Sequence, residues 1–367
     1  MVGSDKMRVV VSAGGTGGHI YPALAIINKI KEMDKNSEIL YIGTTDRMEA
    51  TIIPKQGIKY VGIEMKGLDR HHLLKNFKVL SIYLKARKKI KKVLSEFRPD
   101  IVLGIGGYIT LPVIETAHNL GIKTFIHEQN SIPGLSNRIL SGKADKIGVS
   151  LEDSLQYFDH KKTIFTGNPR SEEILQSKPV LKSKYGLKNN KKLVLIVMGS
   201  LGSMTINNKF KEIIPSFNHK DYEVLFVTGK DYYEDYNSMK NIPTNVKIVP
   251  YLDDMLSVMR KTDLIVTRTG ASTIAEITAI GIPSILIPSP YVTHNHQYKN
   301  AKVLEKAKAA IIIEENNLNS ELLLKTIDDI LKDPKKYDIM KKNSESLGVK
   351  DSASKIYDII KTLIDEG

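Results

Sequence analysis

The sequence predicts two doubly wound α/β domains of similar construction, each built on a parallel sheet. Apolar, β-branched runs alternate with helical patterns through the whole chain, which is typical of parallel βαβ units. Each half also opens in the same way, with a β-branched run that leads into a turn rich in glycine. At 367 residues the chain is long enough for two such domains, each with its own core.

Six strands are expected in the first half, at residues 8–12, 38–42, 60–63, 101–103, 124–127 and 146–149. The second half repeats the pattern, with strands at 193–197, 223–227, 247–249, 264–266, 284–287 and 310–313. A polar stretch at 171–190 separates the halves, and an amphipathic helix is expected at 351–364. We therefore predict an N-terminal domain at 7–169, a C-terminal domain at 170–350, and a final segment at 351–367 that returns to the first domain.

The first glycine turn, at 14–18, lies between the strand at 8–12 and a helical pattern. Glycine lets a backbone approach a ligand closely, and the free N–H groups of a helix start bind anions. His19 follows the turn, and an ordinary histidine pKa near ~6.5 suits proton transfer. The segment matches neither the dinucleotide fingerprint nor the P-loop, and a purely structural turn is the alternative interpretation.

Polar residues also follow later strands, where α/β proteins place their sites. The glycine turn at 104–107 could hold a second anion or be only structural. After the strand at 124–127, Asn130 lies furthest out on the loop, whereas His127 is either a ligand contact or a core residue. In the second half, the turn at 267–270 begins a helix that would suit a diphosphate. Glu276, in its second turn, could accept both hydroxyls of a ribose.

Composition excludes several kinds of site and indicates a basic surface. The chain has no cysteine, which excludes disulfides, thiolate catalysis and cysteine-ligated zinc. No Asp-x-Asp pair is present to hold a metal on a nucleotide diphosphate, so we expect no metal site and positive groups such as Arg170 near the phosphates. The formal net charge of +13 would attract anionic surfaces, although a lysine-rich proteome would explain much of this excess. No apolar run reaches the roughly 18 residues of a membrane-spanning helix.

These segments together resemble the MurG family of UDP-N-acetylglucosamine transferases, which convert lipid I to lipid II in peptidoglycan synthesis. The resemblance covers nearly the whole chain from Met7 onward. It rests on GGTGGHIYPALA at 14–25, GIGGYIT at 104–110, HEQNSIPGLSNR at 127–138, FTGNPR at 165–170, YLDDM at 251–255 and TRTGASTIAEITAIGIP at 267–283. It implies a GT-B fold, in which two Rossmann-like domains face a central cleft, and inversion at the anomeric carbon. The plant galactolipid synthases share the fold, but the HEQN segment favours the MurG family.

The resemblance also implies roles for individual residues. Contacts to the donor sugar or diphosphate would come from Thr16, Gly17, Gly18, Asn130, Arg170 and Ser200. Uracil would meet the backbone of Leu252, the diphosphate and ribose would meet Ala271, Ser272, Thr273 and Glu276, and the sugar hydroxyls would meet Gln297. The acceptor side would include Gly106, Gly107 and Tyr108. The chain departs from the family at 198–202, where MGSLG replaces GGSQG, and at His296, where a second glutamine is common.

We predict that the 4-hydroxyl of the muramoyl sugar attacks UDP-N-acetylglucosamine, with His19 as the base and Glu128 as the alternative. No cofactor is required. The expected partners are UDP-N-acetylglucosamine, lipid I, an anionic membrane surface and other cell-wall synthesis proteins, with no nucleic acid. The rival functions are a nucleotide-sugar epimerase, another GT-B glycolipid synthase, and a basic adaptor protein that binds membranes or nucleic acid.

We expect peripheral attachment to the cytoplasmic face of the bacterial cell membrane. Between 75 and 98 the sequence carries nine bases against the single acid Glu96. Apolar residues recur there at helical spacing, so the simplest interpretation is a stripe that packs on the sheet and a solvated basic face. That basic face could meet anionic headgroups. The loop at 68–74 is the next candidate for membrane contact.

Overall fold

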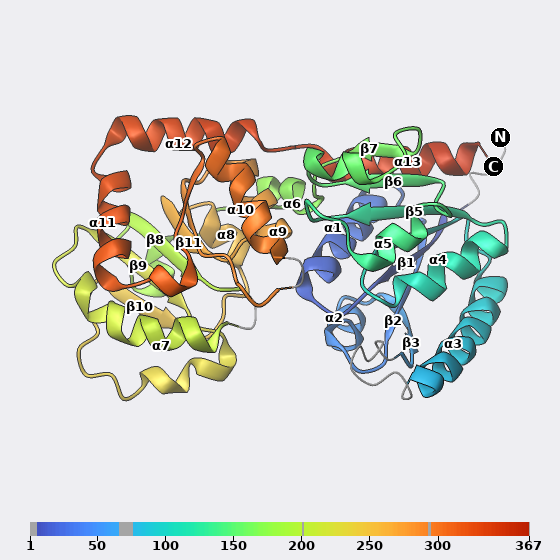
Figure 1. The fold of residues 1–367 in the computed structure, drawn as a ribbon, viewed down its shortest axis with the longest axis horizontal. Coiled ribbons are helices and arrows are strands. Elements are labelled where there is room, and N and C mark those ends of the chain that lie inside the picture. Colours follow the sequence, from blue (N-terminus) through green and yellow to red (C-terminus); the bar gives the residue numbers. More distant parts are fainter. Residues whose placement is uncertain (1–5, 66–75, 200–201, 293–294, 367) are drawn as a thin grey trace. The chain divides into compact units, whose positions relative to one another are not determined.

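The computed structural model describes residues 6–65, 76–199, 202–292 and 295–366. The chain divides into two compact units. Unit 1 comprises Met1–Arg170 and Asp351–Gly367, and unit 2 comprises Ser171–Lys350. Each unit is a parallel sheet with helices on both faces (Figure 1), so the prediction of two doubly wound domains is confirmed.

Unit 1 contains a seven-stranded parallel sheet in the order β3-β2-β1-β4-β5-β6-β7. Its strands are β1 (Arg8–Ala13), β2 (Glu38–Thr44), β3 (Lys59–Ile63), β4 (Ile101–Gly106), β5 (Lys123–Glu128), β6 (Lys146–Val149) and β7 (Thr163–Phe165). The six expected strands are confirmed. Strand β7 was not predicted, because it is a three-residue edge strand with too few positions to show a pattern. The strand order reverses between β1 and β4, where α/β proteins bind ligands.

Helices cover both faces of the unit 1 sheet. One face carries α1 (Gly17–Met33), α2 (Met48–Lys55) and α13 (Ser352–Asp365), and the other carries α3 (Asn76–Phe97), α4 (Thr110–Asn119) and α5 (Leu135–Leu140). Ile356, Ile360 and Leu363 of α13 are buried in one core cluster with residues of α1. In α3, Ala86, Ile90 and Leu94 are buried, so the expected stripe does face the core.

Unit 2 contains a six-stranded parallel sheet in the order β10-β9-β8-β11-β12-β13. Its strands are β8 (Lys192–Val197), β9 (Tyr222–Val227), β10 (Val246–Val249), β11 (Leu264–Thr267), β12 (Ser284–Leu286) and β13 (Ala310–Ile312). All six were expected. The order reverses between β8 and β11, which brings the turns that follow these two strands to the same point of the sheet edge.

Two core clusters lie on opposite faces of the unit 2 sheet. One involves α7 (Met204–Ile213), α11 (Ser320–Leu331) and α12 (Pro334–Ser346). The other involves α8 (Met255–Met259), α9 (Ala271–Ile280) and α10 (His296–Lys306), together with the α6 helix (Arg170–Gln176) through Ile174. Of these helices, α7 and α9 begin at the carboxyl edge of the sheet.

Candidate active site

The first glycine turn joins the ends of β1 and β4, on the two sides of the switch point in unit 1. The backbone N–H of Gly14 donates to the carbonyl of Gly106 over 3.1 Å. A Cβ atom at Gly107 would lie 2.4 Å from the Gly14 carbonyl oxygen, so no side chain fits there. Thr16 is the exposed N-cap of α1 and makes no side-chain capping bond, and Gly17 and Gly18 begin the helix.

Glu49 of α2 holds this turn in place, and sequence analysis did not identify it. Its carboxylate is fully buried. One oxygen accepts hydrogen bonds from Thr44 N (3.1 Å) and Thr44 Oγ1 (2.7 Å) at the end of β2, and the other accepts from Gly15 N over 3.1 Å. The glycine turn is therefore tied to β2 as well as to β4.

His19 lies in the first turn of α1, with its ring against the end of β4. A Cβ atom at Gly106, whose φ is +118°, would lie 2.4 Å from His19 Nδ1. Only glycine therefore leaves room for the imidazole at this place. His19 Nδ1 is 3.0 Å from Oε1 of Gln129, which follows β5.

Gln129 was part of a highlighted segment but received no role from the sequence, which favoured Asn130. Its side chain is buried, and its amide nitrogen donates to the carbonyl of Ile105 over 2.8 Å. The same nitrogen lies 3.1 Å from His127 Nδ1 and 3.2 Å from the His127 carbonyl. Gln129 therefore connects His19 to the interior of the sheet.

His127 is a core histidine, which resolves the two interpretations of its sequence position. Its side chain is fully buried, and Nε2 lies 3.0 Å from the carbonyl of Gly167 and 3.2 Å from Thr166 Oγ1. Burial lowers the pKa of His127 to about 4, and the carbonyl of Gly167 opposes this shift only in part. The ring is therefore neutral at physiological pH.

Glu128 organises the loop that follows β5. Its carboxylate is 2% exposed. One oxygen accepts from the backbone N–H and the side-chain amide of Asn130, at 2.9 and 3.2 Å. The other accepts from Gly134 N (3.0 Å) and from Asn137 Nδ2 (2.8 Å). Four donors thus hold this carboxylate as an acceptor within its own loop, and they also fix Asn130.

Two further expected residues also belong to unit 1. Tyr108 follows β4, is half-buried, and shares a side-chain hydrogen bond with Arg47. Arg170 is the first residue of α6, and its guanidinium carbon lies 5.3 Å from the ring centre of Tyr21 in α1. This cation–π geometry places Arg170 beside the helix that carries His19.

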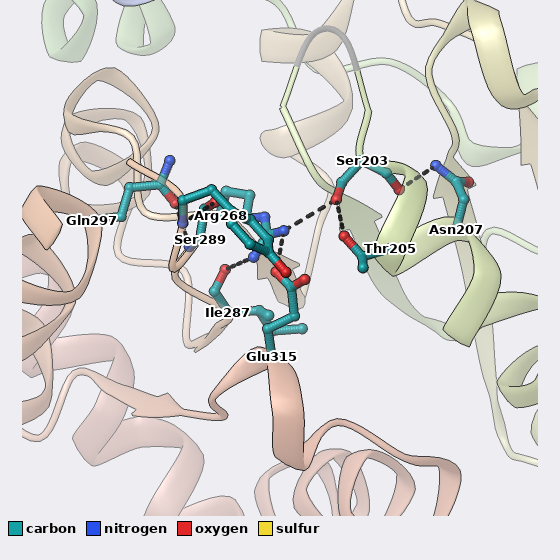
Figure 2. Close-up of polar contacts among 9 residues, drawn as sticks. Ser203, Thr205, Asn207, Arg268, Ile287, Ser289, Gln297 and Glu315 are labelled. Atoms are coloured by element: carbon teal, nitrogen blue, oxygen red, sulfur yellow. Dashed lines mark hydrogen bonds and ion pairs between the residues drawn. The ribbon is translucent and has the colours of Figure 1, made fainter. Parts of the chain in front are cut away.

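In unit 2, a buried arginine joins the turn after β11 to the start of α7. Figure 2 shows the Arg268 side chain among Glu315, Ser203 and Ile287. It forms an ion pair with Glu315 at 2.5 Å and donates to Ser203 Oγ (3.1 Å) and to the carbonyl of Ile287 (3.0 Å). The Arg268 and Glu315 side chains are 9% and 3% exposed. Neither residue was assigned a role from the sequence.

The α9 helix begins as the sequence predicted, at Ala271 after the turn. Ser272 and Thr273 are half-buried in its first turn. Within the described part of the chain, Ser272 Oγ is enclosed and has no hydrogen-bond partner. Glu276 lies in the second turn and is 7% exposed. The first two turns of α9 therefore combine backbone N–H groups, an enclosed hydroxyl and a buried carboxylate.

Gln297 of α10 accepts hydrogen bonds from two neighbouring loops. Its Oε1 accepts from Ser289 N over 2.8 Å (Figure 2), and its carbonyl accepts from Thr269 Oγ1 over 2.6 Å. Leu252 is 2% exposed, and its side chain packs in the core. Ser200 lies outside the described residues, as does the loop at 68–74.

In the ranges that the structure describes, no group of three or more His, Asp or Glu side chains is placed to hold a metal ion. None of the helices in these ranges combines the length and apolar character needed to cross a membrane.

Comparisons with known proteins agree with the fold of two α/β units. Residues 9–149 match the glycosyltransferase family 28 N-terminal domain, and residues 193–363 match the glycosyltransferase family 28 C-terminal domain. The crystal structure of Acinetobacter baumannii MurG superposes with a TM-score of 0.75 at 24% identity, over 97% of this chain and 99% of that one. This neighbour confirms the expected GT-B fold. A putative UDP-N-acetylglucosamine 2-epimerase from Listeria monocytogenes gives a TM-score of 0.72 at 16% identity, over 99% and 97% of the two chains.

A curated relative supplies the finer assignment. The UDP-N-acetylglucosamine--N-acetylmuramyl-(pentapeptide) pyrophosphoryl-undecaprenol N-acetylglucosamine transferase of Halalkalibacterium halodurans is 46% identical over 360 residues, which are 97% of this chain and 99% of the relative. Identity of this extent shows the family. The chain therefore belongs to the family of UDP-N-acetylglucosamine--N-acetylmuramyl-(pentapeptide) pyrophosphoryl-undecaprenol N-acetylglucosamine transferases, the MurG family.

Proposed function

We propose that the protein transfers N-acetylglucosamine from UDP-N-acetylglucosamine to the muramoyl 4-hydroxyl of undecaprenyl-pyrophosphoryl-N-acetylmuramyl-pentapeptide, which converts lipid I to lipid II. The observation that carries this proposal is the 46% identity, over nearly the full length of both chains, to a relative named for that reaction. The reaction serves peptidoglycan synthesis, and therefore cell-wall biogenesis, cell shape and cell division.

Unit 2 binds the donor in this proposal. The N–H groups at the start of α9, with the enclosed Ser272 hydroxyl, suit a diphosphate because they present partial positive charge. Glu276 accepts the ribose hydroxyls from its place in the second turn. Because Gln297 Oε1 is bonded to Ser289 N, we assign its amide nitrogen to the sugar hydroxyls. Ala271, Thr273, Leu252 and Ser200 complete the set in unit 2. Thr16, Gly17, Gly18, Asn130 and Arg170 keep the donor contacts that the family resemblance implies.

Unit 1 supplies the base. We assign that role to His19 in preference to Glu128, because the Glu128 carboxylate already accepts four hydrogen bonds within its loop. The acceptor oxygen attacks the anomeric carbon while its proton passes to the imidazole of His19. The bond between the sugar and UDP breaks as the new glycosidic bond forms, and UDP leaves from the opposite face. Gly106, Gly107 and Tyr108 lie on the acceptor side.

The acceptor lipid places the enzyme at the membrane surface, on the cytoplasmic face. Lys88, Lys91 and Lys92 are exposed on α3, opposite the buried stripe. Each lysine near an anionic surface contributes about 1 kcal/mol at low salt. Changing Lys88, Lys89, Lys91 and Lys92 to Glu should abolish salt-sensitive binding to anionic vesicles and spare transfer to a water-soluble acceptor. Equal vesicle binding by both proteins would place the membrane contact elsewhere.

The direct test of the activity is transfer of labelled N-acetylglucosamine to a short-chain lipid I analogue. The proposal predicts a disaccharide product that forms only when donor and acceptor are both present. Incubation with UDP-N-acetylglucosamine alone distinguishes the transferase from an epimerase, the rival function suggested by the epimerase neighbour. An isomerised nucleotide sugar formed without an acceptor would favour the epimerase. Absence of UDP binding in calorimetry would favour an adaptor.

A further inference from the structure

A continuous chain of polar groups runs from α1 through the loop after β5 to the turn after β7. His19 Nδ1 meets Gln129 Oε1 at 3.0 Å, Gln129 Nε2 meets His127 Nδ1 at 3.1 Å, and His127 Nε2 meets the Gly167 carbonyl at 3.0 Å. Gln129 and His127 are buried, at 2% and 0% exposure. Each group can act only as donor or as acceptor toward its neighbour, so the positions of the hydrogens follow from the carbonyls at the ends.

The orientation of the Gln129 amide is decided by two carbonyl oxygens. Those of Ile105 and His127 lie 2.8 and 3.2 Å from one end of the amide, and a carbonyl can only accept. The NH₂ group must therefore occupy that end, because the flipped amide would place oxygen against both acceptors. The amide oxygen then faces His19 Nδ1, which must carry a hydrogen.

His127 agrees with this assignment from the other side. Its Nε2 lies against the carbonyl of Gly167, so Nε2 carries the hydrogen and Nδ1 of the neutral ring carries the lone pair. That lone pair accepts from the Gln129 amide nitrogen. If the His127 ring were protonated on both nitrogens, it would direct an N–H at the NH₂ group of Gln129. A neutral His127 thus keeps the amide from flipping.

We propose that Gln129 is a positioning residue that holds His19 in the tautomer protonated at Nδ1, so that the lone pair lies on Nε2. The inference rests on the proposed role of His19, because it names the imidazole nitrogen that takes the proton of the acceptor hydroxyl. When His19 becomes an imidazolium, the Nδ1–H bond to Gln129 remains in place. The ring therefore gains and loses its proton at Nε2 without turning.

The surroundings of the ring support a fixed orientation. Gly106 lies against Nδ1, and a Cβ atom there would occupy the place of the ring. Gln129 is itself anchored on β4 through the Ile105 carbonyl. The hydrogen bond is thus made between two groups that are each held by the backbone of β4, which limits the loss of side-chain entropy on ordering them.

The tautomer can be measured without substrate by ¹⁵N NMR of the histidine rings. The chain has nine histidines, and the His19 signals are those that disappear in His19→Gln. In the wild type, above the pKa of His19, Nδ1 should give a protonated-type shift and Nε2 a lone-pair-type shift. In Gln129→Met, which keeps the length of the side chain but not its amide, the two tautomers should exchange and both shifts should move toward the average.

Turnover provides the second measurement. Gln129→Met should lower kcat by about 10- to 10³-fold and leave KM for the donor nearly unchanged, since a wrong tautomer removes the base and not the donor contacts. In Gln129→Glu the neutral carboxylic acid can donate to the Ile105 carbonyl and still accept from Nδ1, so the His19 signals should keep the wild-type pattern. The matched control is Gln56→Met, an exposed glutamine of the same unit, which should behave as wild type.

Two different failures can be told apart. Wild-type ring shifts in a folded Gln129→Met protein, or a wild-type protein with the hydrogen on Nε2, would overturn the tautomer assignment whatever the activity. An active His19→Ala protein with an unchanged pH–rate profile would instead overturn the proposed role of His19. Circular dichroism and urea unfolding of each variant establish that the compared proteins are folded.

Discussion

The carboxyl edges of the two sheets are built on similar strand orders but are held together by different chemistry. In unit 1 the turns are fixed by neutral groups and by buried carboxylates that accept from backbone N–H groups, as Glu49 and Glu128 do. In unit 2 the buried Arg268, in the turn after β11, forms an ion pair with Glu315, which follows β13, and donates to Ser203 at the start of α7. The two units therefore use one topology for two different environments.

This difference matches the separate roles that we propose, with the base in unit 1 and donor binding in unit 2. The unit 1 edge holds a histidine by an amide with a defined donor and acceptor end, which suits the transfer of one proton. The helices α7 and α9 begin at the unit 2 edge, and the N–H groups of a helix start suit an anion. Because each unit has its own core, each edge can be disturbed separately.

The largest effect on stability is expected from breaking the unit 2 ion pair. Arg268→Met leaves the Glu315 carboxylate buried without its partner, so the free energy of unfolding should fall by about 3–5 kcal/mol. The double variant Arg268→Met/Glu315→Leu removes both charges and should recover part of that loss. Urea unfolding measures both. A loss below ~1 kcal/mol in Arg268→Met would show that this turn does not depend on the pair.

In unit 1 the free energy of unfolding should depend on pH through the buried His127. The pKa of His127 is about 4 in the fold and near ~6.5 in the unfolded chain, so below pH ~6.5 the unfolded chain binds a proton that the fold cannot. Stability should therefore fall as pH decreases from ~6.5 to ~4, by about 2 kcal/mol at pH 5 from this residue. In His127→Gln that part of the pH dependence should disappear, whereas the exposed His160→Gln should retain it. Equal pH dependence in both variants would contradict this assignment.

The smallest expected effect is that of metal removal on unit 2. Helix N-termini and hydroxyls meet the diphosphate charge in our proposal, so donor affinity measured by calorimetry should be the same in EDTA and in magnesium. Loss of binding in EDTA and its recovery with magnesium would show that the diphosphate site has been misassigned.

Except for the short β7, the strands were predicted from the sequence because most are apolar runs rich in β-branched residues that end at a glycine or polar turn. The sequence also predicted the glycine turn after β1 and the helix that begins as α9, since each follows a strand closely. It missed the partners of these groups. Gln129 lies 110 residues from His19, Glu315 lies 47 residues from Arg268, and Glu49 lies 34 residues from Gly15. Such pairs form only when the sheet brings separate loops to one edge, and no local pattern marks them.

The most direct test of the account measures donor affinity and turnover side by side in one variant from each unit. His19→Ala should lower kcat for transfer to a lipid I analogue by about 10²–10⁴-fold and leave the Kd for UDP-N-acetylglucosamine nearly unchanged. Glu276→Ala should weaken donor binding by about 1.5–3 kcal/mol, because the ribose hydroxyls lose a charged acceptor. His160→Ala, an exposed histidine in unit 1, is the control. Loss of donor affinity in a folded His19→Ala protein, or unchanged affinity in Glu276→Ala, would contradict the division between a base in unit 1 and a donor site in unit 2.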